Sequence, residues 1–353
     1  MKRERLFYLD LIRVISMLLI VIYHFPLSFY VGTADVLHST VNGRWGVAVV
    51  YVFFMISGAS LFYRYGTEER LDAAAYYKRR IISIYPLFYL AYILGFMYVF
   101  WARGRVYEYV PGWAMIWTVL GMDGYLNSIL PTFTMVGEWF LGAIIIVYAL
   151  FPLLRIGMRK NAELMLMLLC AFTLWIFAVG PIVPVEIKAN PIVDVFFFAL
   201  GAFISEHLRE RIRGDLRIPT ALISGVLLFI WAFVSLPFLK QEVLTSYVPW
   251  ISGLMVNLYD GLGAVMIFVL LMAVSDIFGK NRAVRTLVGK CAGYTYGAFL
   301  IHHLVEAQIC AHFDTAAFGR RDILALLLLC LMSVAVLTGL LYKLMESIRR
   351  MIT

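Results

Sequence analysis

The segment WGVAVVYVFFMISGASLFY, residues 45–63, contains no charged side chain. An α-helix needs about 20 mostly apolar residues to cross the hydrocarbon core of a bilayer, so this segment predicts a membrane-spanning helix. Similar segments recur along the 353 residues with short loops between them. The predicted spans are residues 8–29, 45–63, 82–101, 136–156, 163–180, 191–206, 218–238, 252–275, 292–311 and 322–346.

The composition supports the same class. Apolar residues make up 63% of the chain and charged residues only 15%, whereas soluble domains carry about 25% charged residues. Lipid must therefore replace water around much of the surface. We predict an all-α integral membrane protein of about ten transmembrane helices, with residues 1–353 forming a single membrane-embedded domain. The stretch Trp113–Gly121 is too short to span and is predicted to be interfacial or re-entrant. The outer segment 102–135, which contains it, is a candidate lid.

The basic residues predict the orientation. Cytoplasmic loops collect lysine and arginine, and an N-terminus in the cytoplasm places 22 of the 30 basic residues on that side. Both termini are then cytoplasmic. The net charge of +8 is spread over short clusters between apolar runs, so we expect no nucleic-acid partner. The expected partners include membrane lipids, and homo-oligomer formation stays open.

The cysteines predict neither a disulfide framework nor a metal site. The four are scattered along the chain, and none has the CxxC or Cys/His spacing of a zinc centre. We therefore expect buried structural thiols and no metal. Their positions are Cys170, Cys291, Cys310 and Cys330.

Three ionisable residues, Asp10, Arg13 and His24, lie in the first predicted span. Arg13 and His24 are eleven residues apart, which is close to three helical turns and roughly 16 Å along the axis. Their side chains therefore share one face of the helix. Ionisable groups within a membrane are costly and often functional, although Arg13 could instead extend to the interface. Asp10 is placed to hold Arg13 by an ion pair.

Later polar residues allow a structural or a functional interpretation. His302 and Glu306 share a face of the ninth span and could form a carboxylate–imidazole pair, whereas His303 points elsewhere, towards a neighbouring helix. Arg79 and Arg80 either set the topology or bind an anionic ligand such as a phosphate. Ser57, followed by a glycine, is most simply explained by close helix packing.

Several motifs, in a fixed order, resemble those of the acyltransferase-3 family of membrane acyltransferases. These motifs are Leu9-Asp10-Leu-Ile-Arg13 with His24, Phe53-Phe54-Met-Ile-Ser57-Gly58, Tyr77-Lys78-Arg79-Arg80-Ile-Ile-Ser83-Ile-Tyr85-Pro86, Trp139-Phe140-Leu141 with Tyr148 and Pro152, and Tyr296-Gly-Ala-Phe299-Leu300-Ile301-His302. The chain departs from the family pattern where Ser83 replaces a frequent second arginine and Ile144 replaces a glutamate.

The resemblance implies an O-acetyltransferase-like enzyme that moves an acyl group, most often acetyl, from cytoplasmic acyl-CoA. The implied acceptor is a hydroxyl of a surface glycan or of a lipid-linked glycan precursor, and the implied location is a bacterial plasma membrane. Acyl-CoA would be a co-substrate, with no tightly bound cofactor. The implied catalytic residues are His24, Arg13, His302 and Glu306, and the implied donor-binding residues are Arg13, Arg79, Arg80 and Ser57.

The sequence leaves alternatives open for the catalytic mechanism and for the class of membrane protein. His24 could act as a general base on the acceptor hydroxyl or form a transient acyl-imidazole. Intramembrane Asp, His and Arg residues are also used by proton-coupled transporters, and a lipid-linked glycan flippase would need no acyl chemistry. A membrane sensor or scaffold would not explain the register of Arg13 and His24.

Overall fold

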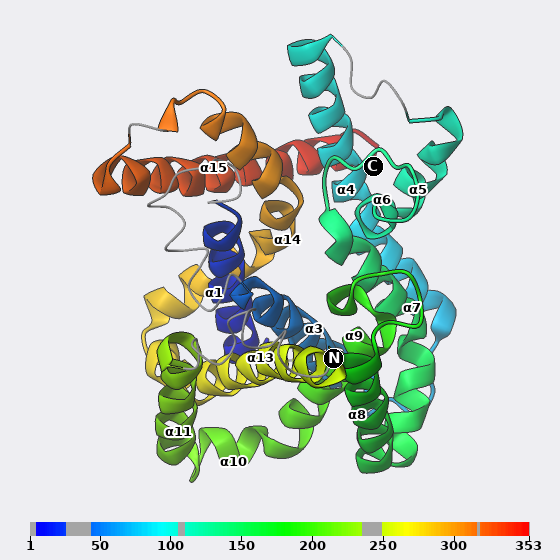
Figure 1. Ribbon diagram of the computed structural model, residues 1–353, viewed down its shortest axis with the longest axis vertical. Coiled ribbons are helices and arrows are strands. Elements are labelled where there is room, and N and C mark those ends of the chain that lie inside the picture. Colours follow the sequence, from blue (N-terminus) through cyan, green and yellow to red (C-terminus); the bar gives the residue numbers. More distant parts are fainter. Residues whose placement is uncertain (1–4, 26–43, 105–109, 235–248, 316–317, 353) are drawn as a thin grey trace. The chain divides into compact units, whose positions relative to one another are not determined.

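The computed structural model describes residues 5–25, 44–104, 110–234, 249–315 and 318–352. Within these ranges every regular element is helical (Figure 1). The predicted spans 8–29 and 218–238 end outside the described residues. The helices are α1 Phe7–His24, α3 Trp45–Tyr65, α4 Ala73–Arg103, α5 Met115–Leu120, α6 Asp123–Leu126, α7 Glu138–Lys160, α8 Ala162–Val179, α9 Pro191–Phe203, α10 Arg209–Arg213, α11 Arg217–Phe229, α13 Pro249–Gly279, α14 Arg282–Cys310 and α15 Arg320–Ile352.

Short 3₁₀ and π turns join these helices. Gly112–Ala114 precedes α5 and Ile187–Ala189 precedes α9, both as 3₁₀ turns. Two π segments, Ile204–Leu208 and Ile230–Val234, continue α9 and α11. The stretch predicted to be interfacial or re-entrant therefore consists of a 3₁₀ turn and the six-residue helix α5, and Trp113 within it is exposed.

Eight helices in the described part of the chain are long and apolar enough to cross a membrane. Of the ten predicted spans, α11 is shorter than this group, and α14 carries two histidines and a glutamate within its apolar stretch. Many large apolar side chains face outwards, including Phe172 and Trp175 on α8 and Ile223 on α11. A surface of this kind is suited to lipid. The protein is an all-helical multi-pass membrane protein; ten spans and two cytoplasmic termini remain predictions.

Helix boundaries follow local capping chemistry. The Asn190 side chain accepts a hydrogen bond from Ile192 N at 3.1 Å, and Pro191 fills the first position of α9, where a missing N–H costs nothing. The Asp72 side chain accepts from Ala75 N at 3.0 Å and begins α4 nine residues before the predicted span. As a result, Arg79 and Arg80 lie on a helix and not in a loop.

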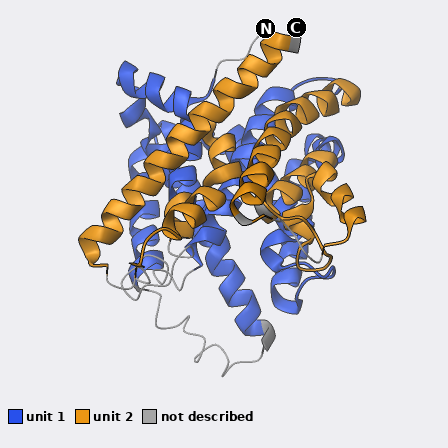
Figure 2. Cartoon of the chain, turned by 90° about the horizontal axis from the view of Figure 1, so that it is seen from above, with its two compact units in different colours: residues 1–20, 36–71, 150–292 blue, residues 21–35, 72–149, 293–353 orange. Residues whose placement is uncertain are grey.

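The chain divides into two compact units, each made of discontinuous segments (Figure 2). Unit 1 contains residues 1–20, 36–71 and 150–292, and unit 2 contains residues 21–35, 72–149 and 293–353. Helices α1, α7 and α14 each contribute residues to both units. The expectation of one domain over residues 1–353 stays a prediction.

In unit 1, α3 packs tightly against α9 through glycines. A Cβ atom built on Gly58 would lie 1.8 Å from the backbone oxygen of Phe198, and one built on Gly201 would lie 2.2 Å from that of Met55. Only glycine allows the two backbones to approach this closely. Close helix packing, the structural interpretation offered for the Ser57–Gly58 pair, is present at Gly58.

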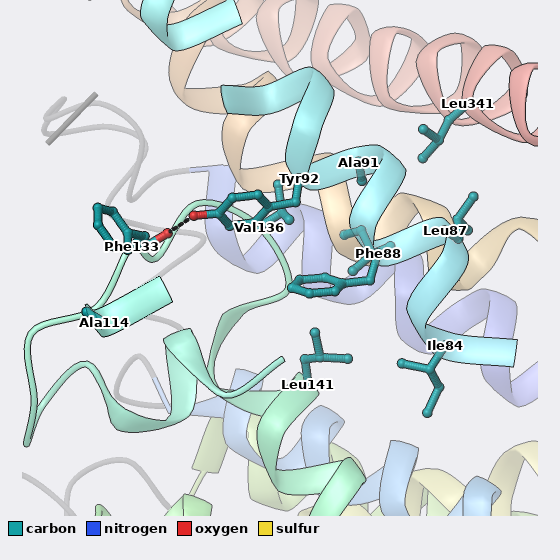
Figure 3. Close-up of a cluster of buried hydrophobic side chains, with 11 residues drawn as sticks. Ile84, Leu87, Phe88, Ala91, Tyr92, Ala114, Phe133, Val136, Leu141 and Leu341 are labelled. Carbon is teal, nitrogen blue, oxygen red and sulfur yellow. Dashed lines mark hydrogen bonds between the residues drawn. The ribbon is translucent and has the colours of Figure 1, made fainter. Parts of the chain in front are cut away.

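In unit 2, a buried apolar cluster surrounds one face of α4 (Figure 3). Phe88 and Tyr92 of α4 pack with Leu141 of α7 and Leu341 of α15. The Tyr92 hydroxyl donates a hydrogen bond to the Phe133 carbonyl at 2.8 Å, which anchors the segment before α7 (Figure 3). This cluster packs α4, α7, α14 and α15 against one another within unit 2.

Candidate functional site

Three imidazole rings meet in unit 2. His24 ends α1, and His302 and His303 are consecutive residues of α14. The ring centroid of His24 lies 5.4 Å from that of His302 and 4.0 Å from that of His303, and the latter two are 4.6 Å apart. One nitrogen from each ring can be chosen so that all three lie within 4.8 Å of one another. We call these residues the histidine cluster.

The local structure determines the tautomer of His302. Its Nδ1 lies 2.8 Å from the Phe299 carbonyl oxygen, three residues earlier on α14. A carbonyl only accepts hydrogen bonds, so Nδ1 carries the proton and Nε2 keeps a free lone pair. The His302 side chain is 1% exposed, and Nε2 has no hydrogen-bond partner among the described residues. It is therefore a buried, unsatisfied base.

Glu306 lies one helical turn after His302 and is fully buried. The expected carboxylate–imidazole pair between them is not formed. Neither carboxylate oxygen of Glu306 has a hydrogen-bond partner within the described ranges. The reason is that His302 Nδ1 is already engaged by the carbonyl of its own helix.

Arg13 lies on the part of α1 that belongs to unit 1. Its Nη1 donates to Asp10 Oδ1 at 3.2 Å, as the spacing predicted, and its Nη2 donates to Ser60 Oγ on α3 at 3.3 Å. Asp10 also pairs with Arg5 Nε at 2.5 Å. Ser57 lies on the same helix as Ser60. Arg13 is therefore held by two helices, with its side chain 27% exposed.

Arg79 and Arg80 occupy the first turns of α4 in unit 2. The Arg79 side chain is exposed. The Arg80 guanidinium lies over the rings of Tyr76 and Tyr148, at 5.9 and 5.6 Å from their centroids. Cation–π contacts of this kind orient the guanidinium while leaving its edge available for hydrogen bonding.

A cavity of about 600 Å³ opens beside this turn of α4, within unit 2. α4 contributes Ser83 to its lining, and α15 contributes Lys343 and Arg349. Three tyrosines, Tyr294, Tyr296 and Tyr342, also line it, together with the acidic Glu346. Its volume lies within the range of small-molecule sites, roughly 300–1,000 Å³.

Several of these features could not be inferred from the sequence. His303 was expected to point towards a neighbouring helix, and its ring lies 4.0 Å from that of His24 on α1. The sequence did not indicate that this neighbour would be His24, or that the ring would also lie 4.6 Å from that of His302. Arg44 and Asp260 form a bidentate ion pair in unit 1, and Asp194 is fully buried with no hydrogen-bond partner among the described residues. The available signal for the histidine cluster was a His-His pair inside an otherwise apolar helix.

Comparison with known proteins identifies the family of the chain. No curated protein and no solved structure matches the chain. Residues 6–342, nearly the whole sequence, match the acyltransferase-3 family, which is described as an acyltransferase domain. Together with its membrane-spanning helices, this match shows that the chain belongs to the acyltransferase-3 family of membrane acyltransferases.

Proposed function

We propose that this acyltransferase moves an acetyl group from cytoplasmic acetyl-CoA to a hydroxyl of a surface glycan or of its lipid-linked precursor. The observation that carries the proposal is the meeting of His24 with His302 and His303 in a chain that belongs to this family. Uncharged imidazoles in a buried setting can take a proton from a hydroxyl or attack a thioester.

In the favoured route, His24 is the general base. It removes the proton of the acceptor hydroxyl while the oxygen attacks the thioester carbonyl, and the carbon–sulfur bond breaks to release coenzyme A, whose thiolate takes up the proton. In the second route, His24 attacks the thioester carbonyl first, and the carbon–sulfur bond breaks to release coenzyme A, whose thiolate takes up the ring proton. The acceptor hydroxyl then attacks the acyl-imidazole, the carbon–nitrogen bond breaks, and the hydroxyl proton passes to the released imidazole. His302 and Glu306 would assist proton transfer in either route.

The donor would bind through its phosphates and its nucleotide. Arg79 and Arg80 are oriented on one helix beside the tyrosine-lined cavity, where Lys343 and Arg349 add positive charge. Guanidinium groups bind phosphate bidentately, and aromatic rings stack on purine bases. In unit 1, Arg13, with Ser57 on the adjoining helix, is the further donor-binding element that we propose.

The remaining assignments concern the setting. We propose a bacterial plasma membrane as the location. The beginning of α4 and the end of α15 would face the cytoplasm, because their basic residues follow the positive-inside pattern. The outer segment 102–135 would contact the acceptor, and its residues 105–109 lie outside the described ranges. Glycan rings stack on aromatic side chains, and exposed Trp113 is available there.

The experiment measures release of coenzyme A and transfer of label from radiolabelled acetyl-CoA by detergent-purified protein, with native membrane extract as the acceptor source. The transfer rate of His24→Ala should be at least about 100-fold lower than that of wild type, which is the usual contribution of general acid–base catalysis. His312→Ala is the matched control, because this exposed histidine lies outside the histidine cluster.

The same preparation separates the two routes. An acyl-imidazole would leave hydroxylamine-labile label on the wild-type protein when acceptor is withheld, whereas direct base catalysis would leave none. Full activity in a folded His24→Ala variant would refute the role of His24. No turnover of acetyl-CoA by wild type under any acceptor condition would refute this donor.

A further inference from the structure

We propose that the histidine cluster is a binding site for a divalent transition metal ion, with Zn²⁺ as the best match, and that the bound ion suppresses acyl transfer. The second part rests on the proposed function, because it assumes that His24 works as a general base or as a nucleophile. The first part stands on the geometry of the cluster alone.

The spacing of the ligand atoms suits a shared metal ion. Zinc–nitrogen bonds of about 2.0–2.1 Å place the nitrogens of a tetrahedral site roughly 3.4 Å apart. The three ligand nitrogens of the cluster lie within 4.8 Å of one another. Rotation of the imidazole rings about their side-chain bonds would bring these nitrogens closer together.

The hydrogen bonding of His302 matches that of a metal ligand. Histidines that bind metals usually donate their second ring N–H to a carbonyl or carboxylate, which fixes the tautomer. His302 does so, since Nδ1 donates to the Phe299 carbonyl at 2.8 Å and Nε2 is left buried with its lone pair free. A buried, unsatisfied acceptor of this kind is costly unless something occupies it.

The ligand chemistry determines which ion is preferred. Three neutral imidazoles suit zinc, copper, nickel and cobalt, whereas magnesium and calcium require oxygen ligands. A three-histidine set leaves a fourth coordination position open.

Metal binding and catalysis would compete for the same atoms. The ion occupies the lone pair of His24, which the proposed transfer needs for the acceptor proton or for the acyl group. Zinc should therefore inhibit the transferase, and a chelator should restore the activity. No covalent or redox step is involved.

Binding is tested first, without any activity measurement. Chelator-stripped, detergent-purified protein is dialysed against Zn²⁺ and its metal content is measured. Wild type should bind one equivalent, and His303→Ala should raise the Kd by about 100-fold or more, at least the loss seen when an outer-shell partner is removed. His312→Ala and the Cys310→Ser/Cys330→Ser double variant, which removes the two buried thiols of unit 2, should bind as wild type does.

Cobalt provides a spectroscopic check of the ligands. Co²⁺-loaded wild type should show the visible absorption of a four-coordinate nitrogen site, and the band should disappear in His302→Ala and in His303→Ala. Size-exclusion profiles and melting temperatures identify variants that fail to fold. If His303→Ala fails, His303→Gln replaces it, because glutamine keeps much of the volume of the histidine side chain. Equal zinc affinity in wild type and folded His303 variants would overturn the proposal.

Inhibition is tested separately, so that its failure differs from a failure of the proposed function. If the protein transfers acetyl groups, stoichiometric Zn²⁺ should lower the transfer rate of wild type at least about tenfold. The transfer rate of His303→Ala should be the same with and without that concentration of zinc. Zinc binding without inhibition would overturn the inhibitory role. Zinc binding in a protein that never turns over acetyl-CoA would uphold the site and refute the donor assignment.

Discussion

Removing Arg44 should destabilise unit 1 strongly, because it leaves the Asp260 carboxylate buried without its counterion. Arg44 precedes α3, and its Nε lies 3.0 Å from Asp260 Oδ2 on α13. The Asp260 side chain is fully buried, whereas that of Arg44 is 41% exposed. The pair is therefore buried at one end and hydrated at the other.

The magnitude follows from this geometry. At 3 Å the Coulomb energy of two unit charges is about 5.5 kcal/mol at an effective dielectric constant near 20, and about 1.4 kcal/mol in bulk water. Removing one partner of a fully buried pair costs roughly 3–5 kcal/mol. Because Arg44 is partly hydrated, we expect Arg44→Met to cost about 2–4 kcal/mol, which corresponds to a fall in melting temperature of roughly 4–8 °C.

The assay is thermal unfolding of detergent-purified protein, followed by intrinsic fluorescence and by loss of the monodisperse chromatographic peak. Arg209→Met is the matched control, since the partner of Arg209 is Glu210, whose side chain is 84% exposed. An exposed pair contributes at most about 1 kcal/mol. The double variant Arg44→Met/Asp260→Leu should regain most of the lost stability, because it removes the unpaired charge. Equal melting of the Arg44 and Arg209 variants would refute the reasoning.

Three further predictions concern packing, pH and donor binding. Gly58→Leu should prevent stable folding or lower the free energy of unfolding by at least about 3 kcal/mol, because its Cβ would lie 1.8 Å from the Phe198 carbonyl oxygen. The control Ala59→Gly, on the same helix, should lower it by only about 1 kcal/mol. Expression level and melting temperature measure both effects. Burial raises the pKa of Asp123 above its ordinary value, so the folded state binds this proton more tightly and stability is lost as pH rises through the folded pKa. Asp123→Asn should therefore raise the melting temperature at neutral pH and have no such effect below about pH 4, and a constant difference across the range would contradict this. Arg80→Lys should raise KM for acetyl-CoA about tenfold with little change in kcat, because lysine loses the bidentate fork and the tyrosine stacking; an unchanged KM would remove Arg80 from the donor site.

Much of the fold could be predicted from hydropathy and charge. Apolar runs of about 20 residues leave few alternatives to a helix in lipid, so the predicted span 45–63 agrees with α3 within two residues. The start of α4 was predicted nine residues late, because its first turns are amphipathic and their helical structure depends on the cap at Asp72. The family match confirmed the resemblance that the ordered motifs indicated.

The candidate site was less accessible to prediction. Helical spacing placed Arg13 and His24 on one face, and it gave His302 and Glu306 a shared face, because these relations lie within single helices. Contacts between distant helices carry no such periodic signal. The packing of His303 on His24 and the pairing of Arg44 with Asp260 depend on which helices become neighbours, and neither pair shows a sequence pattern.

The interleaving of the two units has a consequence for biosynthesis. Unit 2 takes residues 21–35 from the beginning of the chain and residues 293–353 from its end, so His24 leaves the ribosome long before His302 and His303 exist. A unit closed by such distant contacts forms only after chain synthesis is nearly complete. Until then the first helix must wait in the bilayer without its neighbours from α14, exposed to lipid and to quality-control proteases. Chains that terminate before α14 should be degraded and should not accumulate as partly active fragments.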